Sequence, residues 1–106
     1  MASRVKRVSR AAGEVFPLSA SSTGDIGVIV RVGPEVDDEV VGRSELERRL
    51  LEMGFVEGAK IRVLHEGFIG RDPIAVQLDD MRVALRRREA ADVLVQSLAP
   101  DQDRPA

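Results

Sequence analysis

Apolar residues alternate with polar or small residues in four segments of the chain, and this pattern predicts four β-strands. The segments span residues 26–32, 60–66, 74–78 and 81–86. Successive side chains of a strand point to opposite faces of a sheet, so every second residue shares one face. The residues that share a face are Ile26, Val28, Val30 and Val32 in the first segment, Ile61 and Val63 in the second, Ile74, Val76 and Leu78 in the third, and Met81, Val83 and Leu85 in the fourth. The faces of the last three segments are expected to point inward.

Glycine and proline mark irregular points near the start of this pattern. Gly27, inside the first strand, indicates a bulge or a place where another part of the backbone approaches closely. Residues 15–19 form a short apolar segment. Pro17 restricts this segment to a sheet edge or a strand start, because proline has no backbone N–H to donate.

Two further segments have the periodicity of helices. Leu46, Leu50 and Met53 fall at i, i+4 and i+7, which predicts a helix over about residues 44–53. Ser44 and Glu47 have the spacing of a capping box at its start. A second apolar stripe predicts a C-terminal helix over about residues 87–98; its members are Ala91, Leu94, Val95 and Leu98. The first helix is too short to be stable alone in water, so it must pack on the rest of the domain.

A glycine stop and a tight turn join the first helix to the strand that follows. Gly54 stands where the helix must end, and glycine adopts the left-handed conformation there without steric cost. Phe55 is then placed to pack back on Leu50, the contact that usually accompanies such a stop. Gly58 occupies the third position of a turn over residues 56–59, where a type II turn requires a positive φ. These residues are therefore predicted to have a structural role.

Two connections between the later strands are predicted to differ in character. Asp79-Asp80 is expected to form a two-residue hairpin turn, because aspartate tolerates the left-handed conformation. Residues 67–73 are expected to form a loop that carries Phe68 and Ile69 between glycines and ends at Pro73. Large apolar residues on such a loop indicate a contact site for a protein partner, or a lid folded back over the open end of a barrel.

Composition limits the chain to one aliphatic domain. The 106 residues contain 43% hydrophobic residues and 3% aromatic residues. We expect an ordered domain over residues 15–98, a disordered basic arm over 1–14 and a disordered tail over 99–106. Several short strands with few connections predict a small closed β-barrel, since closure hides strand edges. The fold class is therefore mainly β with the two predicted helices.

The charge and hydropathy patterns restrict the partners. The net charge of −2 argues against a whole-protein electrostatic binder of nucleic acid, although Arg82, Arg86 and Arg88 keep that alternative open. No run of about 18 apolar residues occurs, so no membrane span is expected. The basic N-terminus lacks a following apolar region, and no secretory signal is expected. Homo-oligomerisation is compatible with the sequence.

Candidate catalytic and metal-binding residues are few. The chain has no cysteine and a single histidine, His65, which excludes thiolate metal sites and cysteine nucleophiles. No serine or threonine has a recognisable nucleophile context, so no catalytic residue is predicted. His65 and Glu66, with nearby carboxylates, are the candidate metal ligands, although zinc sites usually cluster several His and Cys residues. No cofactor is firmly predicted beyond weak transition-metal binding.

One long motif and several short ones occur in a defined order. The long motif is Arg49-Leu50-Leu51-Glu52-Met53-Gly54-Phe55-Val56-Glu57-Gly58. The short ones are Pro17-Leu18-Ser19, Gly24 before Ile29-Val30, Gly70 with Asp72-Pro73-Ile74, and Ala84-Leu85-Arg86-Arg87-Arg88-Glu89-Ala90 followed by Val95. Together they resemble the FeoA family, small cytoplasmic proteins associated with bacterial ferrous iron transport. The resemblance covers most of residues 16–95.

The resemblance implies an SH3-like β-barrel that is not an enzyme. It implies a cytoplasmic accessory protein that binds FeoB, a membrane iron transporter with a cytosolic GTPase domain. On this interpretation Phe68, Ile69 and Arg71 form part of the contact, while Gly54, Phe55, Gly58 and Pro73 support the frame. The same domain type forms the C-terminal part of repressors related to the diphtheria toxin repressor. A metal-responsive regulatory module is therefore the alternative.

Some residues depart from the usual family pattern. Ser21 and Thr23 replace a hydrophobic residue and a proline, and Glu57 replaces a proline before Gly58. Asp80 replaces the usual hairpin glycine, and Arg71 is one residue more than the common loop has. The acidic residues 35–43 and both termini lie outside the resemblance. The departures leave open whether the chain is a transporter partner or a paralogue with another role.

Overall fold

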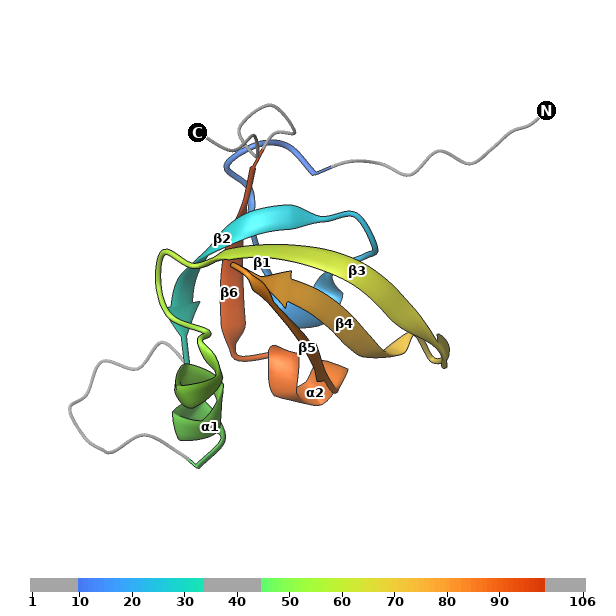
Figure 1. The fold of residues 1–106 in the computed structure, drawn as a ribbon. Coiled ribbons are helices and arrows are strands. Elements are labelled where there is room, and N and C mark those ends of the chain that lie inside the picture. The colour runs from blue at the N-terminus through green and yellow to red at the C-terminus, as the bar shows by residue number, and fades with distance from the viewer. Residues whose placement is uncertain (1–9, 34–44, 99–106) are drawn as a thin grey trace.

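A computed structural model describes residues 10–33 and 45–98 as a curled antiparallel sheet with short helices (Figure 1). The strands are arranged in the order β1-β6-β2-β3-β4-β5. Their bounds are β1 Val15–Pro17, β2 Ile26–Val32, β3 Lys60–Ile69, β4 Asp72–Leu78, β5 Met81–Leu85 and β6 Val93–Ser97; the helices are η1 Leu18–Ala20, α1 Glu45–Met53 and α2 Arg87–Ala90. Among these described strands β1 and β5 stand at the two ends and do not pair with each other, so the sheet curls around the core without the full closure that was predicted. The predicted Ser44 cap, the acidic residues 35–43, most of the basic arm and the C-terminal tail lie outside the described residues.

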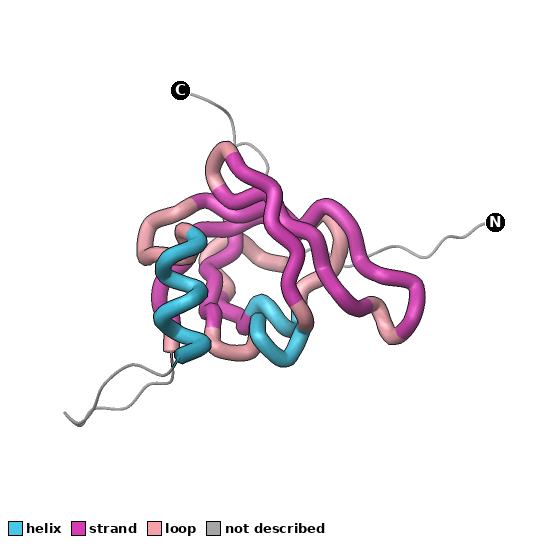
Figure 2. The backbone as a smooth tube through the Cα atoms, turned by 60° about the horizontal axis from the view of Figure 1, so that its bottom comes forward, coloured by secondary structure: helices cyan, strands magenta, loops and turns pink. Residues whose placement is uncertain are grey.

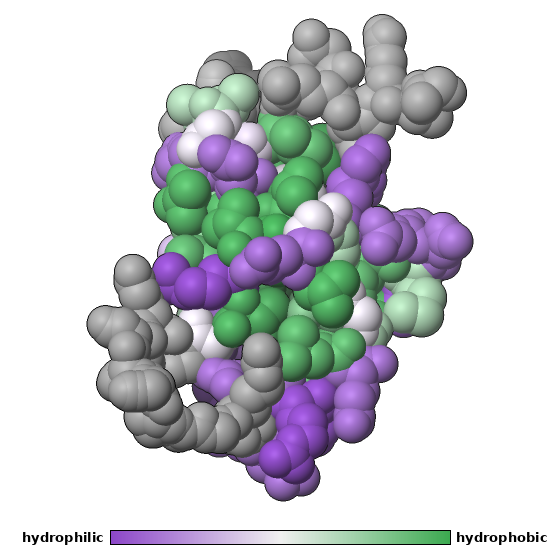
Figure 3. Space-filling view, turned by 90° about the vertical axis from the view of Figure 1, so that its left-hand side faces the viewer, coloured by the Kyte–Doolittle hydropathy of each residue, from purple (hydrophilic) through white to green (hydrophobic). Residues whose placement is uncertain are grey.

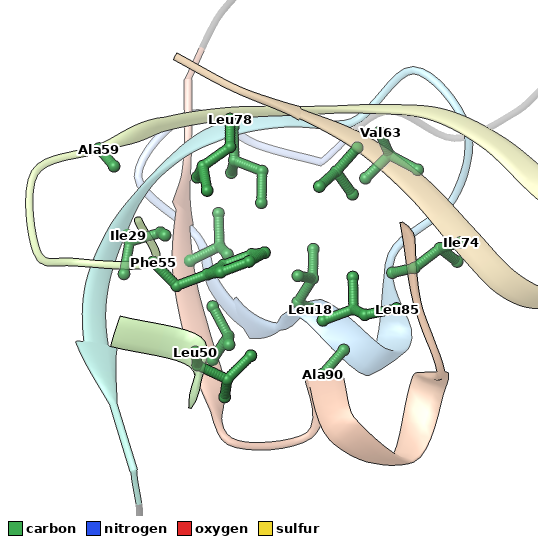
Figure 4. Packing of buried hydrophobic residues seen from close by; sticks show 14 of the residues in the cluster. Leu18, Ile29, Leu50, Phe55, Ala59, Val63, Ile74, Leu78, Leu85 and Ala90 are labelled. Carbon is green, nitrogen blue, oxygen red and sulfur yellow. The ribbon is translucent and has the colours of Figure 1, made fainter. Parts of the chain in front are cut away.

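The sheet encloses one largely aliphatic core that also contains two buried phenylalanines, Phe16 and Phe55 (Figure 4). Phe55 is fully buried and lies among Leu50, Ile29 and Leu78 in this view. Leu18 from η1 and Ala90 from α2 close the core from below. The predicted inward faces of β3 and β4 are confirmed: Ile61, Val63, Ile74, Val76 and Leu78 are all buried.

The predicted helix stop between α1 and β3 is confirmed in detail. Gly54 has a φ of 110°, and its N–H donates to Leu51 O over 3.0 Å. The Phe55 N–H donates to Leu50 O over 2.9 Å, which completes a Schellman motif. In the next turn, Ala59 N–H donates to Val56 O over 3.1 Å, and the φ of Gly58 is 91°. The turn therefore directs the chain from the helix end into the sheet.

Most apolar residues of β2 lie on the face with Ile26, Val28 and Val30, but the opposite face of the strand, with Gly27 and Ile29, points to the core. Gly27 and Ile29 are buried, while Val28 and Val30 are only half-buried. A Cβ at Gly27 would lie 2.5 Å from Gln96 O and would overlap Val95, so the predicted close approach of backbone is confirmed. The irregularity in the ladder falls later, between Ile29 and Arg31. This β-bulge turns Val32 to the core side, which separates Val32 from the other residues of the predicted face.

The predicted C-terminal helix over residues 87–98 is wrong beyond its first turn. The helix α2 ends at Ala90, and the chain continues as β6. Val93, Val95 and Ser97 alternate as buried residues, and β6 pairs with both β1 and β2. Short apolar runs are ambiguous between the two periods, and here the unpaired edges of β1 and β2 favour a strand. As predicted for Pro17, β1 lies at the sheet edge.

The predicted loop over residues 67–73 is also wrong, because β3 and β4 form a long hairpin there. Only Gly70 and Arg71 separate the two strands, and their φ values are 69° and 61°. Positive φ at both central residues is the requirement of a type I′ hairpin turn. The hairpin therefore carries Phe68 and Ile69 at the end of a strand instead of on an irregular loop.

The β4–β5 connection confirms one prediction and corrects another. Asp79 has a φ of 54°, and the two aspartates form the two-residue turn expected. Leu85 is buried and Val83 packs on the core, but Met81 is 49% exposed. Met81 lies beside the α1–β3 turn, where its Cε would be 3.6 Å from a Cβ at Gly54.

The side of the molecule with α1 and this turn shows a broad apolar surface crossed by hydrophilic side chains (Figure 3).

Candidate protein-binding site at the β3–β4 hairpin

The tip of the β3–β4 hairpin exposes two large apolar side chains next to an arginine. Phe68 is fully exposed, at 102% of its reference area, and Ile69 is 84% exposed. The hairpin projects away from the helices and the rest of the sheet (Figure 2). Neighbouring exposed apolar side chains of this size are typical of interaction surfaces. We call Phe68, Ile69 and Arg71 the hairpin tip.

A carboxylate at the base of the hairpin connects it to a distant loop. The Glu66 carboxylate accepts hydrogen bonds from Arg71 Nε at 2.6 Å and from Arg87 Nη2 at 3.2 Å. It also accepts from the N–H and the hydroxyl of Thr23, at 2.7 Å and 3.0 Å. The hairpin, the loop before β2 and α2 therefore meet at one side chain. We call these four residues the Glu66 network.

Arg87 uses its remaining donors to bind main-chain carbonyls from two other segments. Its Nη1 donates to Ser19 O at 2.9 Å and to Ser21 O at 3.0 Å, and its Nε donates to Arg71 O at 2.7 Å. Its backbone N–H donates to Asp72 Oδ1 at 2.8 Å. The side chain is 16% exposed, whereas that of Arg71 is 60% exposed. Arg87 therefore holds the base of the hairpin, and Arg71 reaches from the tip.

The network also sets the protonation of Glu66. The hydrogen bond from Arg71, followed by that from the Thr23 N–H, lowers the pKa of Glu66 from 4.5 to about 2, although partial burial acts in the opposite direction. A carboxylate whose pKa is lower in the folded state stabilises the fold above its unfolded pKa.

We expect the stability contributed by Glu66 to be complete above pH 4.5 and to be lost as the pH falls towards 2. Urea midpoints measured between pH 6 and pH 2 should fall less steeply in Glu66→Gln than in the wild-type chain, because the amide does not titrate. Parallel midpoint curves for the two proteins would show that Glu66 does not titrate as the network requires.

The candidate metal ligands, His65 and Glu66, are consecutive residues of β3, and no third described His, Asp or Glu residue is placed to complete a site with them. His65 is exposed and is paired with Ala75, while Glu66 is paired with Ile74. The Glu66 carboxylate already accepts hydrogen bonds from two arginines. Within residues 10–33 and 45–98, no group of three or more His, Asp or Glu residues is placed to hold a metal ion. The described geometry therefore gives the metal-binding hypothesis no support.

The predicted structural residues fall in two places. Gly54, Phe55 and Gly58 lie together in the α1–β3 turn, on the side of Figure 1 away from the hairpin tip. Pro73 lies exposed near the start of β4, two positions after Arg71.

Arg87 and Thr23 belong to the Glu66 network, but the sequence did not predict them as members of the site. These residues are 21 and 43 positions from Glu66, so no local pattern could have revealed the network.

The six-stranded sheet and the projecting hairpin define a small SH3-like β-barrel with two exposed apolar side chains at the hairpin tip. In the described part of the chain, no helix is long and apolar enough to cross a membrane. The FeoA domain family matches residues 16–97, which is most of the described fold. The chain therefore belongs to the FeoA domain family.

A relative from Porphyromonas gingivalis places this domain next to a transporter in one polypeptide. The chain is 40% identical over 82 residues to its Fe(2+) transport protein A/Fe(2+) transporter FeoB fusion protein. The match covers 77% of this chain but only 9% of the fusion protein. The chain thus spans only a small fraction of the length of this relative.

Solved FeoA structures share the fold. FeoA of Stenotrophomonas maltophilia, solved with zinc and described as an SH3 domain protein, is 32% identical with a TM-score of 0.61, over 76% of this chain and 89% of that one. FeoA of Chlorobium tepidum is 32% identical with a TM-score of 0.64, over 86% and 78% of the two chains. A manganese-dependent transcriptional repressor, 23% identical with a TM-score of 0.64, shares the fold over 83% of this chain and 44% of its own.

Proposed function

We propose that this chain is a non-enzymatic, cytoplasmic accessory protein of ferrous iron transport. It binds the cytosolic GTPase part of a FeoB-type membrane transporter through the hairpin tip. The single observation that carries the proposal is the full exposure of Phe68 beside Ile69 on a projecting hairpin. The natural fusion of the two proteins in Porphyromonas gingivalis supports the choice of partner, because fusion keeps two domains close together.

The chemistry of the tip suits a protein surface with an apolar pocket. Aromatic anchors that fill a pocket, together with arginine, contribute much of the binding energy in protein interfaces. The Glu66 network holds the base of the hairpin before binding, so less conformational entropy is lost when the partner binds. Arg71 adds a cation at the rim of the tip, with its side chain 60% exposed.

The double substitution Phe68→Ala with Ile69→Ala tests the proposal. We expect it to weaken binding to the purified soluble domain of the transporter by about 30-fold or more, measured by calorimetry, because it truncates both anchors. Its free energy of unfolding should equal that of the wild type, since neither side chain is buried.

Val15→Ala is the matched control. Val15 is also exposed and apolar, but it lies in β1, which β6 and β2 separate from the β3–β4 hairpin in the sheet. We expect it to bind the transporter domain like the wild type. Wild-type affinity in the double variant would refute the hairpin contact, and loss of affinity in Val15→Ala would assign the contact to another face.

A further inference from the structure

The outer edge of β5 has main-chain groups that are not paired with any described strand. Among the described strands, β5 is the last of the sheet and pairs only with β4. The two-residue turn makes Leu78 and Met81 the first hydrogen-bonded pair, so the ladder bonds fall on every second residue from Met81 onward. The N–H and C=O groups of Arg82 and Ala84 therefore point away from β4. Both residues are exposed, and no described residue forms a backbone hydrogen bond with either on this side.

The two faces beside this edge differ in chemistry. Arg82, Ala84 and Arg86 follow one another at alternate positions and are all exposed. Within the described residues, neither arginine side chain forms an ion pair. On the other face, Met81 is half exposed and Val83 is partly buried against the core. The edge thus has a cationic face and an apolar face.

We propose that the β5 edge binds an extended segment of another protein in which acidic and apolar residues alternate. The segment adds to the sheet as a seventh strand and pairs with the free groups of Arg82 and Ala84. Because side chains alternate along a strand, its acidic residues lie beside Arg82 and Arg86 while its apolar residues cover Met81 and Val83. Cross-strand pairs of opposite charge and of apolar residues both stabilise such an arrangement.

Charge distinguishes this partner from a second copy of the chain. Two β5 edges paired antiparallel about Ala84 would bring Arg82 of each copy opposite Arg86 of the other. Like charges placed directly opposite each other destabilise strand pairing, and edge charges of this kind prevent self-association. Nucleic acid is a poorer match for a different reason, since no aromatic residue in β5 is available to stack on bases.

The probe is a blocked, fluorescent peptide of alternating Glu and Val, about eight residues long, the length of an ordinary strand. We expect it to bind the full chain and to protect the amides of Arg82 and Ala84 from hydrogen exchange, observed by NMR. A peptide with Lys in place of Glu should bind at least about tenfold more weakly, because it places like charges opposite the arginines.

Two variants of the chain test the edge directly. Ala84→Pro removes a free N–H that β4 does not use, and it should abolish peptide binding. Arg82→Glu with Arg86→Glu should weaken binding at least about tenfold by reversing the charge of that face. Arg88→Glu, an exposed arginine of α2 outside the strand, is the matched control and should bind the peptide like the wild type.

Several results would overturn strand addition at β5. They are wild-type binding by the double charge variant, protection of amides elsewhere, a dimer that Ala84→Pro dissociates without peptide, or salt-sensitive binding of oligothymidylate in place of the peptide. If Ala84→Pro does not fold, the double charge variant decides alone. The substitutions of Phe68 and Ile69 should leave peptide binding unchanged, so failure of the hairpin contact and failure of the edge site are distinguishable.

Discussion

Phe55→Ala is expected to lower the free energy of unfolding by about 3–5 kcal/mol, the usual range for truncating a buried phenylalanine. Phe55 is fully buried in the middle of an aliphatic core, in contact range of side chains from α1 and the sheet (Figure 4). Its removal leaves a cavity that the surrounding strands fill poorly, because they are fixed by ladder hydrogen bonds. Urea unfolding followed by far-UV circular dichroism measures the change.

The chain has its own control for this experiment. Phe68→Ala removes the same atoms from a position that is fully exposed. We expect its free energy of unfolding to stay within about 0.5 kcal/mol of the wild type. If both substitutions destabilise the chain equally, then Phe68 is covered in solution and the hairpin tip is not a free surface.

Arg87→Ala is expected to have the second largest effect on stability, about 2–4 kcal/mol. The substitution removes one partner of Glu66 and leaves the carbonyls of Ser19 and Ser21 without their donor. Buried acceptors that lose a hydrogen bond retain the cost of desolvation. The loss should also appear as faster hydrogen exchange at the base of the β3–β4 hairpin.

Arg88→Ala separates the role of position 87 from that of an arginine in general. Arg88 is the next residue in α2, is exposed, and has no hydrogen bond or ion pair to a described residue. Its substitution should change the free energy of unfolding by less than about 0.5 kcal/mol. Arg87→Lys should recover only part of the loss, because an ammonium group cannot reproduce the fork of guanidinium donors. Equal effects at positions 87 and 88 would contradict the network.

Local sequence patterns determined much of the scaffold. The stop at Gly54 and Phe55 followed from the chemistry of one helix end, and both hydrogen bonds of the motif are present. The inward faces of β3 and β4 followed from strict alternation, which a one-residue shift would reverse. The sequence singled out Phe68 and Ile69 between glycines but left open an exposed contact site or a lid over the barrel, and the structure exposes both side chains.

Other features were decided by contacts that lie far apart in the sequence. Residues 93–97 fit a helical stripe as well as a strand, and pairing with β1 and β2 selected the strand. In β2, the approach of Gln96 and Val95 to Gly27 set which face turned inward, against the distribution of valines. The alternation of apolar residues shows only which residues share a face of the strand. Packing against the neighbouring strand determines whether that face is buried or exposed.

The site shows the same division for a physical reason. The apolar tip is local, so the sequence by itself named Phe68 and Ile69 as candidate contact residues, and both are exposed. The network behind the tip joins Glu66 to Thr23 and Arg87, and only the folding of the curled sheet brings these three segments within hydrogen-bonding distance. Hydrogen bonds between distant segments leave no periodic trace in the sequence. Only the tertiary structure therefore decided how the tip is held.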